Sequence, residues 1–348
     1  MRAVLIESFG VTPVVTDVPE PTPTRDGVVV RVQATGLCRS DFHAWSGHDD
    51  GVTLPHVPGH ELVGVVTEVG PDVRRVRVGD RITTPFVCGC GACDECRAGN
   101  AQVCPNQEQP GFTHAGSFPE LVEVRHADVN AVTVPDSADA AGAALLGCRL
   151  ATSFRALAQA GTGPGDTVLV IGCGGVGLSA VMIARALGAE VVAVDLDAAA
   201  LRRATELGAG HAVGIAGLSP DDARDAVRAA VRAIGGGDGA SVAVEGIGNE
   251  SALALGIRSL RRQGTLVQVG LFAAEPRVPV PDMIARELRL IGSHGMAAAD
   301  YPAMMAMVAD GRLQPERLVS QRITLDEAPA ALAGLDGRAA DGVAVITF

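Results

Sequence analysis

Four cysteines with metal-ligand spacing lie in the first third of the chain, at Cys90, Cys93, Cys96 and Cys104. Sulfur is a preferred ligand of zinc, and the pattern C-x2-C-x2-C-x7-C keeps four thiolates within reach of one ion. Polar neighbours indicate an exposed lobe, where four free thiols would be prone to oxidation. We predict a structural zinc in a lobe at about 88–104, although Cys88 is a fifth thiol that spacing alone does not exclude.

A second set of metal-ligand side chains is scattered along the chain, at Cys38, His60, Glu61 and Cys148. Its composition suits an open zinc site, in which three protein ligands leave one position for water or substrate. The members lie too far apart for a local motif, and a lone histidine is more often structural than a ligand. The residues alone therefore leave the ligand set open.

A glycine-rich turn at 172–177 has the pattern GxGxxG, between an expected strand at 168–171 and an expected helix at 178–187. Such glycines let the backbone approach a pyrophosphate, which rests on the helix N-terminus. Asp195 ends the next expected strand, 18 residues after Gly177. Its carboxylate can accept hydrogen bonds from ribose hydroxyls and would repel a 2′-phosphate, which favours NAD over NADP.

Strands and helices alternate from this turn onward, which predicts an α/β fold with a doubly wound parallel sheet. Before it the chain reads as short strands separated by prolines, and then as helix over 136–160. The expected strands are 28–32, 63–66, 168–171, 191–194, 242–244, 265–269 and 288–291, and the expected helices after the turn are 178–187, 198–207 and 251–260.

Composition excludes several classes of function. The 348 residues carry a net charge of −12, which disfavours nucleic acid or an anionic membrane as a partner. All 28 basic residues are arginine, which excludes a Schiff-base lysine and a Walker loop. The uncharged stretch 167–184 contains four glycines, so we expect a strand, a turn and a helix there and no membrane span. Eight cysteines and no signal-peptide pattern predict a cytoplasmic protein.

Residues 59–70, GHELVGVVTEVG, resemble the GHExxGxVxxVG signature of zinc-containing alcohol dehydrogenases in the medium-chain dehydrogenase/reductase (MDR) superfamily. Residues 36–43 resemble the first ligand segment of that family, and the cysteine lobe and glycine turn follow in its order. The resemblance covers the whole chain. It implies a β-rich GroES-like catalytic domain at 1–149 and 293–348, a Rossmann NAD-binding domain at 150–292, and an active site in the cleft between them.

The resemblance also implies a role for individual side chains. Cys38, His60 and Cys148 would bind a catalytic zinc, the second zinc of the chain. Glu61 would approach that metal during ligand exchange, Asp41 would orient the ligand histidine, and Ser40 and His43 would relay the proton. Trp45 and Phe86 match pocket walls, with ordinary core packing as the alternative. The implied coenzyme contacts are Arg39, Thr152, Gly172, Gly174, Gly175, Val176, Gly177, Asp195 and Val269.

Two positions depart from the family pattern. Arg149 follows Cys148 where many members have a small residue, so it would narrow or charge the edge of the site. Val343 lies at about the place of a basic tail residue that touches coenzyme phosphates. The histidines His48, His56, His114, His126 and His211 are expected to be surface or loop residues, and His294 is a weaker pocket candidate.

The implied activity is reversible hydride transfer between a small-molecule alcohol and NAD, giving an aldehyde or ketone. Polyol dehydrogenases and carbonyl or quinone reductases of the same superfamily are alternatives. The polyol branch commonly has a glutamate as third ligand where this chain has Cys148, and the quinone reductases lack zinc. A catalytically silent NAD-binding or redox-sensing protein is the alternative from another class. The expected edge strand at 288–291 predicts a homo-oligomer, and the resemblance implies the same because family members are often oligomeric. The state is either a dimer or a tetramer.

Overall fold

The computed structural model describes residues 1–335 and 342–348, and these residues form two compact units. Of the described residues, unit 1 comprises 1–151, 295–335 and 343–348, and unit 2 comprises 152–294 and 342. Each unit has its own sheet, and each carries a different group of the site residues.

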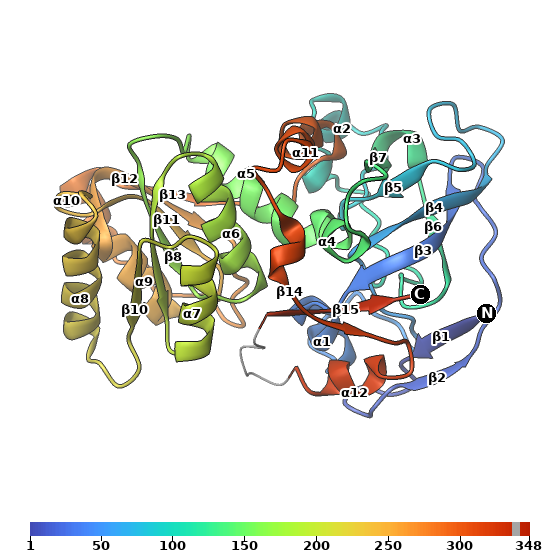
Figure 1. Ribbon diagram of the computed structural model, residues 1–348, viewed down its shortest axis with the longest axis horizontal. Helices are drawn as coiled ribbons and strands as arrows, with labels where there is room; N and C mark the ends of the chain where they lie inside the picture. Colours follow the sequence, from blue (N-terminus) through green and yellow to red (C-terminus); the bar gives the residue numbers. More distant parts are fainter. Residues whose placement is uncertain (336–341) are drawn as a thin grey trace. The chain divides into compact units, whose positions relative to one another are not determined.

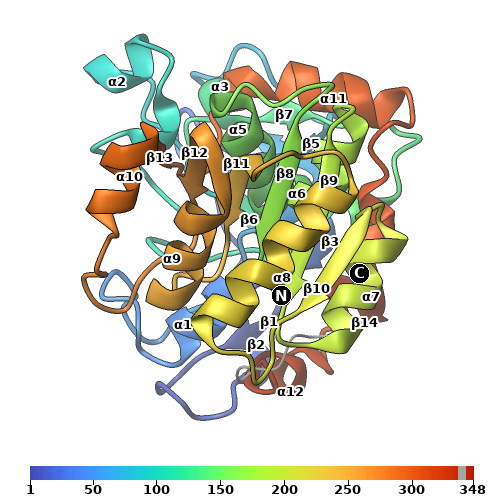
Figure 2. The ribbon, with the colours of Figure 1, turned by 90° about the vertical axis from the view of Figure 1, so that its left-hand side faces the viewer.

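Unit 2 is built on a six-stranded parallel sheet with the order β10-β9-β8-β11-β12-β13. Helices α6 and α7 cover one face of this sheet, and α8 and α9 cover the other (Figures 1 and 2). The strands are β8 Thr167–Ile171, β9 Glu190–Asp195, β10 His211–Gly214, β11 Ala240–Glu245, β12 Leu260–Gln268 and β13 Arg289–Gly292. The helices are α6 Gly175–Ala186, α7 Ala198–Glu206, α8 Pro220–Ala233, α9 Glu250–Ser259 and α10 Val280–Arg286.

The sequence of the central strands explains this arrangement. All five residues of β8 are buried, as expected for a strand with helices on both faces. The strand order reverses direction between β8 and β11, which is the switch point where ligands of such sheets bind. The glycine turn follows β8 directly at this point. The predicted doubly wound α/β fold is confirmed.

Unit 1 is β-rich, as predicted. Its main sheet has the order β14-β15-β3-β4-β5-β7, with β6 also paired to β3, and β1 pairs with β2 separately. Valines along β3 and β4 alternate into a buried cluster that includes Val28, Val30 and Val66. The strands are β1 Arg2–Leu5, β2 Val14–Asp17, β3 Val28–Gly36, β4 Leu62–Val69, β5 Arg81–Thr83, β6 Leu121–Val124, β7 Val132–Thr133, β14 Val319–Ile323 and β15 Val343–Thr347.

Short helices connect these strands and carry the chemistry of unit 1. The α-helices are α1 Arg39–Trp45, α2 Asp94–Arg97, α3 Ala127–Asn130, α4 Ala140–Ala144, α11 Tyr301–Ala309 and α12 Ala328–Ala333, and α5 Ala151–Gln159 leads into unit 2. The 3-10 helices are η1 Ala101–Val103, η3 Ala298–Asp300 and η4 Pro315–Leu318, and a π-helical turn, η2, spans Leu146–Leu150.

The uncharged stretch 167–184 forms β8, the glycine turn and most of α6, as predicted. Among the described residues, no helix combines the length and apolarity needed to cross a bilayer.

Candidate functional site

Cys38, His60, Glu61 and Cys148 converge in unit 1, although 110 positions separate the first from the last. One ligand atom from each lies within 4.8 Å of the others. Cys38 follows β3, His60 and Glu61 precede β4, and Cys148 lies in the π turn η2. The pairing of β3 with β4 brings the first three together, because Thr35 lies opposite Leu62 in the ladder.

Asp41 holds two of these segments in place. Its Oδ2 accepts a hydrogen bond from the backbone N–H of Cys38 at 2.9 Å, which caps the N-terminus of α1. Its Oδ1 accepts from the backbone N–H of Gly59 at 3.1 Å and lies 3.0 Å from Nδ1 of His60. Burial alone would lower the pKa of His60, but the charge and hydrogen bond of Asp41 raise it well above its ordinary value. A carboxylate in this position fixes the orientation of a ligand histidine.

The other ring nitrogen of His60 suits a metal ion. The side chain is fully buried, and Nε2 has no hydrogen-bond partner among the described residues. A buried polar atom without a partner is costly, and a cation among Nε2 and the two sulfur atoms removes that cost. The ring lies between Phe112 and Phe86, with centroid distances of 5.2 and 6.2 Å. Phe86 is thus beside the cluster, whereas Phe112 is an aromatic neighbour that no sequence signal indicated.

The two thiols are poised for metal binding. A hydrogen bond from Cys148 lowers the pKa of Cys38 well below its ordinary value, and His60 and Arg149 add to the effect. The same hydrogen bond, together with burial, raises the pKa of Cys148 well above its ordinary value. Without metal the pair therefore shares one proton, which a metal ion would release on binding both sulfurs. Two thiolates and one imidazole form a ligand set that fits zinc.

Glu61 does not stand free beside this cluster. Its carboxylate is fully buried and pairs with Arg149, with N–O distances of 2.6–3.0 Å from Nε and Nη2. Burial raises the pKa of the Glu61 carboxyl, and the guanidinium opposes that rise. Arg149 is itself only 5% exposed, so it charges the interior of the site and not merely its edge.

The π turn explains how consecutive residues, Cys148 and Arg149, both reach the cluster. The N–H of Leu150 donates to the carbonyl of Leu145, five residues earlier. Such turns are rare and recur at functional sites. The hydroxyl of Tyr301 in α11 lies 3.2 Å from the carbonyl oxygen of Leu146 and 3.4 Å from that of Gly147. Tyr301 is fully buried and supplies a donor to carbonyls of this turn.

Replacing Tyr301 with phenylalanine should lower the free energy of unfolding by about 1–2 kcal/mol, because buried carbonyls lose a donor while the ring packing is kept. The measurement is urea denaturation. Ser320→Ala is the control, because it removes an exposed hydroxyl donor from the same unit and should change stability by less than about 0.5 kcal/mol. Equal stability of the two variants would show that Tyr301 does not support the turn.

Helix α1 places the expected proton-relay pair near the cluster. The hydroxyl oxygen of Ser40 lies 3.9 Å from Sγ of Cys38, and His43 lies one turn further on, at the surface. Partial burial lowers the pKa of His43, and the charge of Arg39 adds to this, so the ring is neutral near pH 7. Arg39 is exposed and donates to the carbonyl of Leu335 at 2.7 Å.

Trp45 and His56 are both buried in unit 1. Trp45 lies in a hydrophobic cluster with Val4, Ile6 and Leu37, and its indole N–H donates to the carbonyl of Val11. This placement favours core packing, the alternative to a pocket wall. His56, expected to be a surface or loop histidine, lies in a loop but is buried.

His56 is 6% exposed and its Nε2 lies 2.6 Å from the carbonyl oxygen of Gly111. It is a structural histidine that ties two loops together. A single histidine between Pro55 and Val57 gave no sign of this contact.

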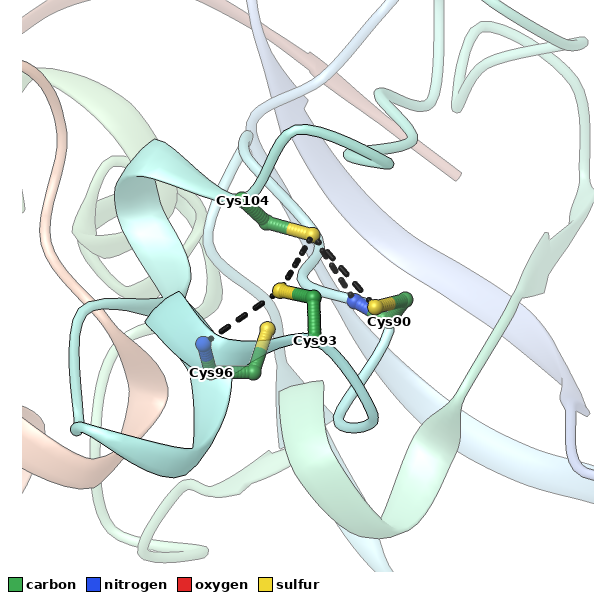
Figure 3. A group of neighbouring side chains, drawn as sticks. All are labelled: Cys90, Cys93, Cys96 and Cys104. Carbon is green, nitrogen blue, oxygen red and sulfur yellow. Dashed lines mark hydrogen bonds between the residues drawn. The ribbon is translucent and has the colours of Figure 1, made fainter.

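The cysteine quartet also converges (Figure 3). Sγ of Cys104 lies 3.5 Å from that of Cys90 and 3.6 Å from that of Cys93. A tetrahedral zinc with Zn–S bonds of about 2.3 Å separates its sulfurs by about 3.8 Å, so the spacing fits. The backbone N–H groups of Ala92 and Cys93 lower the pKa of Cys90 to about 6, which supplies a thiolate near neutral pH.

Cys88 stands apart from the quartet. It is 1% exposed, and its sulfur lies 3.4 Å from the hydroxyl of Thr84 and 3.5 Å from the carbonyl oxygen of Pro85. Burial raises the pKa of this thiol to about 12, so it is a poor ligand. The quartet is therefore Cys90, Cys93, Cys96 and Cys104, and none of the chain's eight cysteines, all in described residues, forms a disulfide.

Unit 2 assembles the expected coenzyme residues around the glycine turn. A β-carbon at Gly177 would collide with the carbonyl of Gly172, so glycine allows α6 to start directly against the strand. A β-carbon at Gly174 would meet nothing within 4 Å, so the turn is open on that side. Asp195 accepts hydrogen bonds from the N–H groups of Cys173 at 2.6 Å and Asp197 at 2.9 Å.

The remaining expected contacts of unit 2 flank this turn. Ser153, next to Thr152, donates to the carbonyl of Val176 at 2.8 Å and so joins α5 to α6. Val269 follows β12 and donates its N–H to the carbonyl of Glu245. Val269 and the glycine turn lie at the carboxyl ends of β12 and β8, where this sheet type binds ligands.

Comparison with known proteins agrees with the geometry of both units. Residues 24–136 match the family "alcohol dehydrogenase GroES-like domain", and residues 175–310 match "zinc-binding dehydrogenase". An alcohol dehydrogenase of Geobacillus stearothermophilus is 36% identical over 320 residues, or 90% of each chain. The chain belongs to the zinc-binding alcohol dehydrogenase family.

Other members of this family match the chain over almost its full length. An NAD-dependent alcohol dehydrogenase of Sulfurisphaera tokodaii is 31% identical over 99% of both chains. A solved structure from Sinorhizobium meliloti, assigned as a zinc-binding dehydrogenase and bound to NADP, has a TM-score of 0.88 and 30% identity, and the match covers 100% of this chain and 99% of the other. Membership makes the chain an oxidoreductase of the MDR superfamily.

Proposed function

We propose that this dehydrogenase oxidises an alcohol with NAD, and reduces the corresponding carbonyl, at a zinc ion held by Cys38, His60 and Cys148. The observation that carries the proposal is the buried Nε2 of His60, without a hydrogen-bond partner and next to two sulfur atoms. When bound, zinc supplies Lewis-acid polarisation of the substrate oxygen, and NAD supplies the hydride acceptor.

The side chains of the site divide the remaining work. Asp41 holds the His60 ring so that Nε2 points at the metal position. Ser40 would accept the hydroxyl proton at its Oγ as it gives up its own proton, and the exposed, neutral His43 would take up the released proton and return it to solvent. Phe86 and Phe112 give the His60 side of the site an apolar wall that excludes water.

The direct test is NADH formation by the zinc-replete protein on primary, secondary, benzylic and polyhydroxy alcohols. Turnover on one class of simple alcohols supports the proposal and reveals the shape of the pocket. Preference for polyhydroxy substrates would instead favour a polyol dehydrogenase. Retained NADH binding without turnover on any substrate would favour the catalytically silent alternative.

We further propose that Asp195 selects NAD. Asp195→Asn removes the charge and keeps one oxygen that can accept from Cys173 N–H in the glycine turn, while the N–H of Asp197 loses its acceptor. The ratio of kcat/KM for NADP to that for NAD should rise by at least about tenfold, equivalent to about 1.4 kcal/mol of removed repulsion. Asp197→Asn, at a neighbouring carboxylate that caps α7, is the control and should leave the ratio unchanged. An unchanged ratio in Asp195→Asn would contradict the assignment.

The domain roles and assembly are proposals as well. We infer that unit 1 is the catalytic domain and unit 2 the NAD-binding domain, since each carries the corresponding residues. The edge strand β13 exposes Leu290, which supports pairing of two sheets in a dimer or within a tetramer, testable by light scattering. Eight cysteines without a disulfide suit the reducing cytoplasm.

A further inference from the structure

The carboxylate of Glu61 is close enough to the metal position to be a ligand. One of its oxygens lies within 4.8 Å of the ligand atoms of Cys38, His60 and Cys148. Four protein ligands make a closed zinc site, whereas three leave a position for substrate. Whether Glu61 binds the metal therefore decides whether a coordination position remains for the substrate.

Arg149 holds the buried carboxylate of Glu61 in place and prevents it from rotating freely. Its Nε donates to both oxygens, at 2.9 and 3.0 Å, its Nη2 donates to Oε2 at 2.6 Å, and its own backbone N–H lies 3.3 Å from Oε1. Nη2 also donates to the carbonyl of Leu37, the residue before Cys38, at 2.9 Å. Bidentate pairs of this kind fix the orientation of a carboxylate as well as its charge.

The surrounding chain packs closely against this pair. Glu61 is fully buried, and a β-carbon at Gly36 would collide with its Oε2. Charge balance also favours the pairing of Glu61 with Arg149. Two thiolates and one carboxylate carry three negative charges, which a divalent metal and one guanidinium neutralise. Without the guanidinium, the metal would be the nearest cation to a buried carboxylate.

We propose that Arg149 is a positioning residue that locks Glu61 and so prevents its carboxylate from occupying the open coordination position of the metal at Cys38, His60 and Cys148. This inference rests on the proposed function, because it takes those three residues as ligands. It assigns a role to Arg149, and it does not depend on the substrate.

The test uses cobalt(II) in place of zinc and follows its visible d–d bands while imidazole is added. Only an open site can accept imidazole, so the four-cysteine site does not respond. The wild-type bands should shift, Arg149→Met should need at least tenfold more imidazole for half of the shift, and Arg149→Met/Glu61→Gln should respond like the wild type. An imidazole response of Arg149→Met equal to that of the wild type would overturn the proposal that Arg149 locks Glu61.

A conservative variant keeps the test decisive if Arg149→Met does not fold. Arg149→Lys keeps the charge but offers one donor group in place of the fork, so it should need about threefold more imidazole. A wild-type imidazole response in Arg149→Lys would contradict the proposal. Absence of any imidazole response in the wild-type protein would instead refute the metal assignment on which the proposal stands.

Discussion

Replacement of His60 with alanine is expected to lower kcat/KM for alcohol oxidation by at least about 10³-fold. The lost metal contributes several kcal/mol of stabilisation to the developing charge, and each 1.4 kcal/mol is about tenfold in rate. The same variant should contain about one zinc per chain instead of two, because the cysteine quartet is untouched. Zinc content by mass spectrometry and NADH formation are the two readouts.

A matched variant separates this effect from the general loss of a histidine. His211 is exposed on the edge strand β10 of unit 2, so His211→Ala should keep both zinc ions and near-normal turnover. The assignment of His60 fails if His60→Ala keeps both zinc ions. It also fails if turnover of His60→Ala matches that of His211→Ala.

The second large effect is expected at the cysteine quartet. Cys104→Ser should remove the other zinc and lower the midpoint of thermal unfolding by more than about 6 °C. This corresponds to about 3 kcal/mol in a unit of this size, and structural zinc sites contribute folding energy directly. The three remaining thiols, one with a pKa of about 6, should also become prone to oxidation. Calorimetry and zinc content measure both consequences.

Cys88→Ala provides the control for the quartet. This thiol is buried near the lobe but outside the four ligands, and its pKa of about 12 keeps it protonated. It should lose some packing energy and no zinc. Loss of one zinc from Cys88→Ala, or full stability of Cys104→Ser, would mean that the four ligands are assigned incorrectly.

Spacing along the chain was enough to predict the cysteine quartet and the glycine turn. The four cysteines span 15 positions, and the glycine turn joins one strand to the next helix, so neither depends on distant contacts. The cluster at Cys38 is different. It is assembled by the β3–β4 pairing and by the π turn, and only resemblance to a family related its members before the structure did.

Other features had weaker signals or none. Helix α8 was not predicted, although its buried residues recur at helical spacing, at Ala223, Val227, Ala230 and Val231. The four-residue strand β10 is largely exposed at the edge of the sheet and has no alternating pattern. The contact between Tyr301 and the π turn links residues more than 150 positions apart, so no window of sequence contains it.

The placement of Trp45 and Tyr301 has a practical consequence for optical spectroscopy. They are the chain's single tryptophan and single tyrosine, and both lie in unit 1. Tryptophan and tyrosine fluorescence therefore follows the melting of that unit alone, and unit 2 contributes no such emission until a fluorescent nucleotide occupies it. An emission curve and a calorimetric trace that disagree would then indicate that the two halves unfold in separate steps.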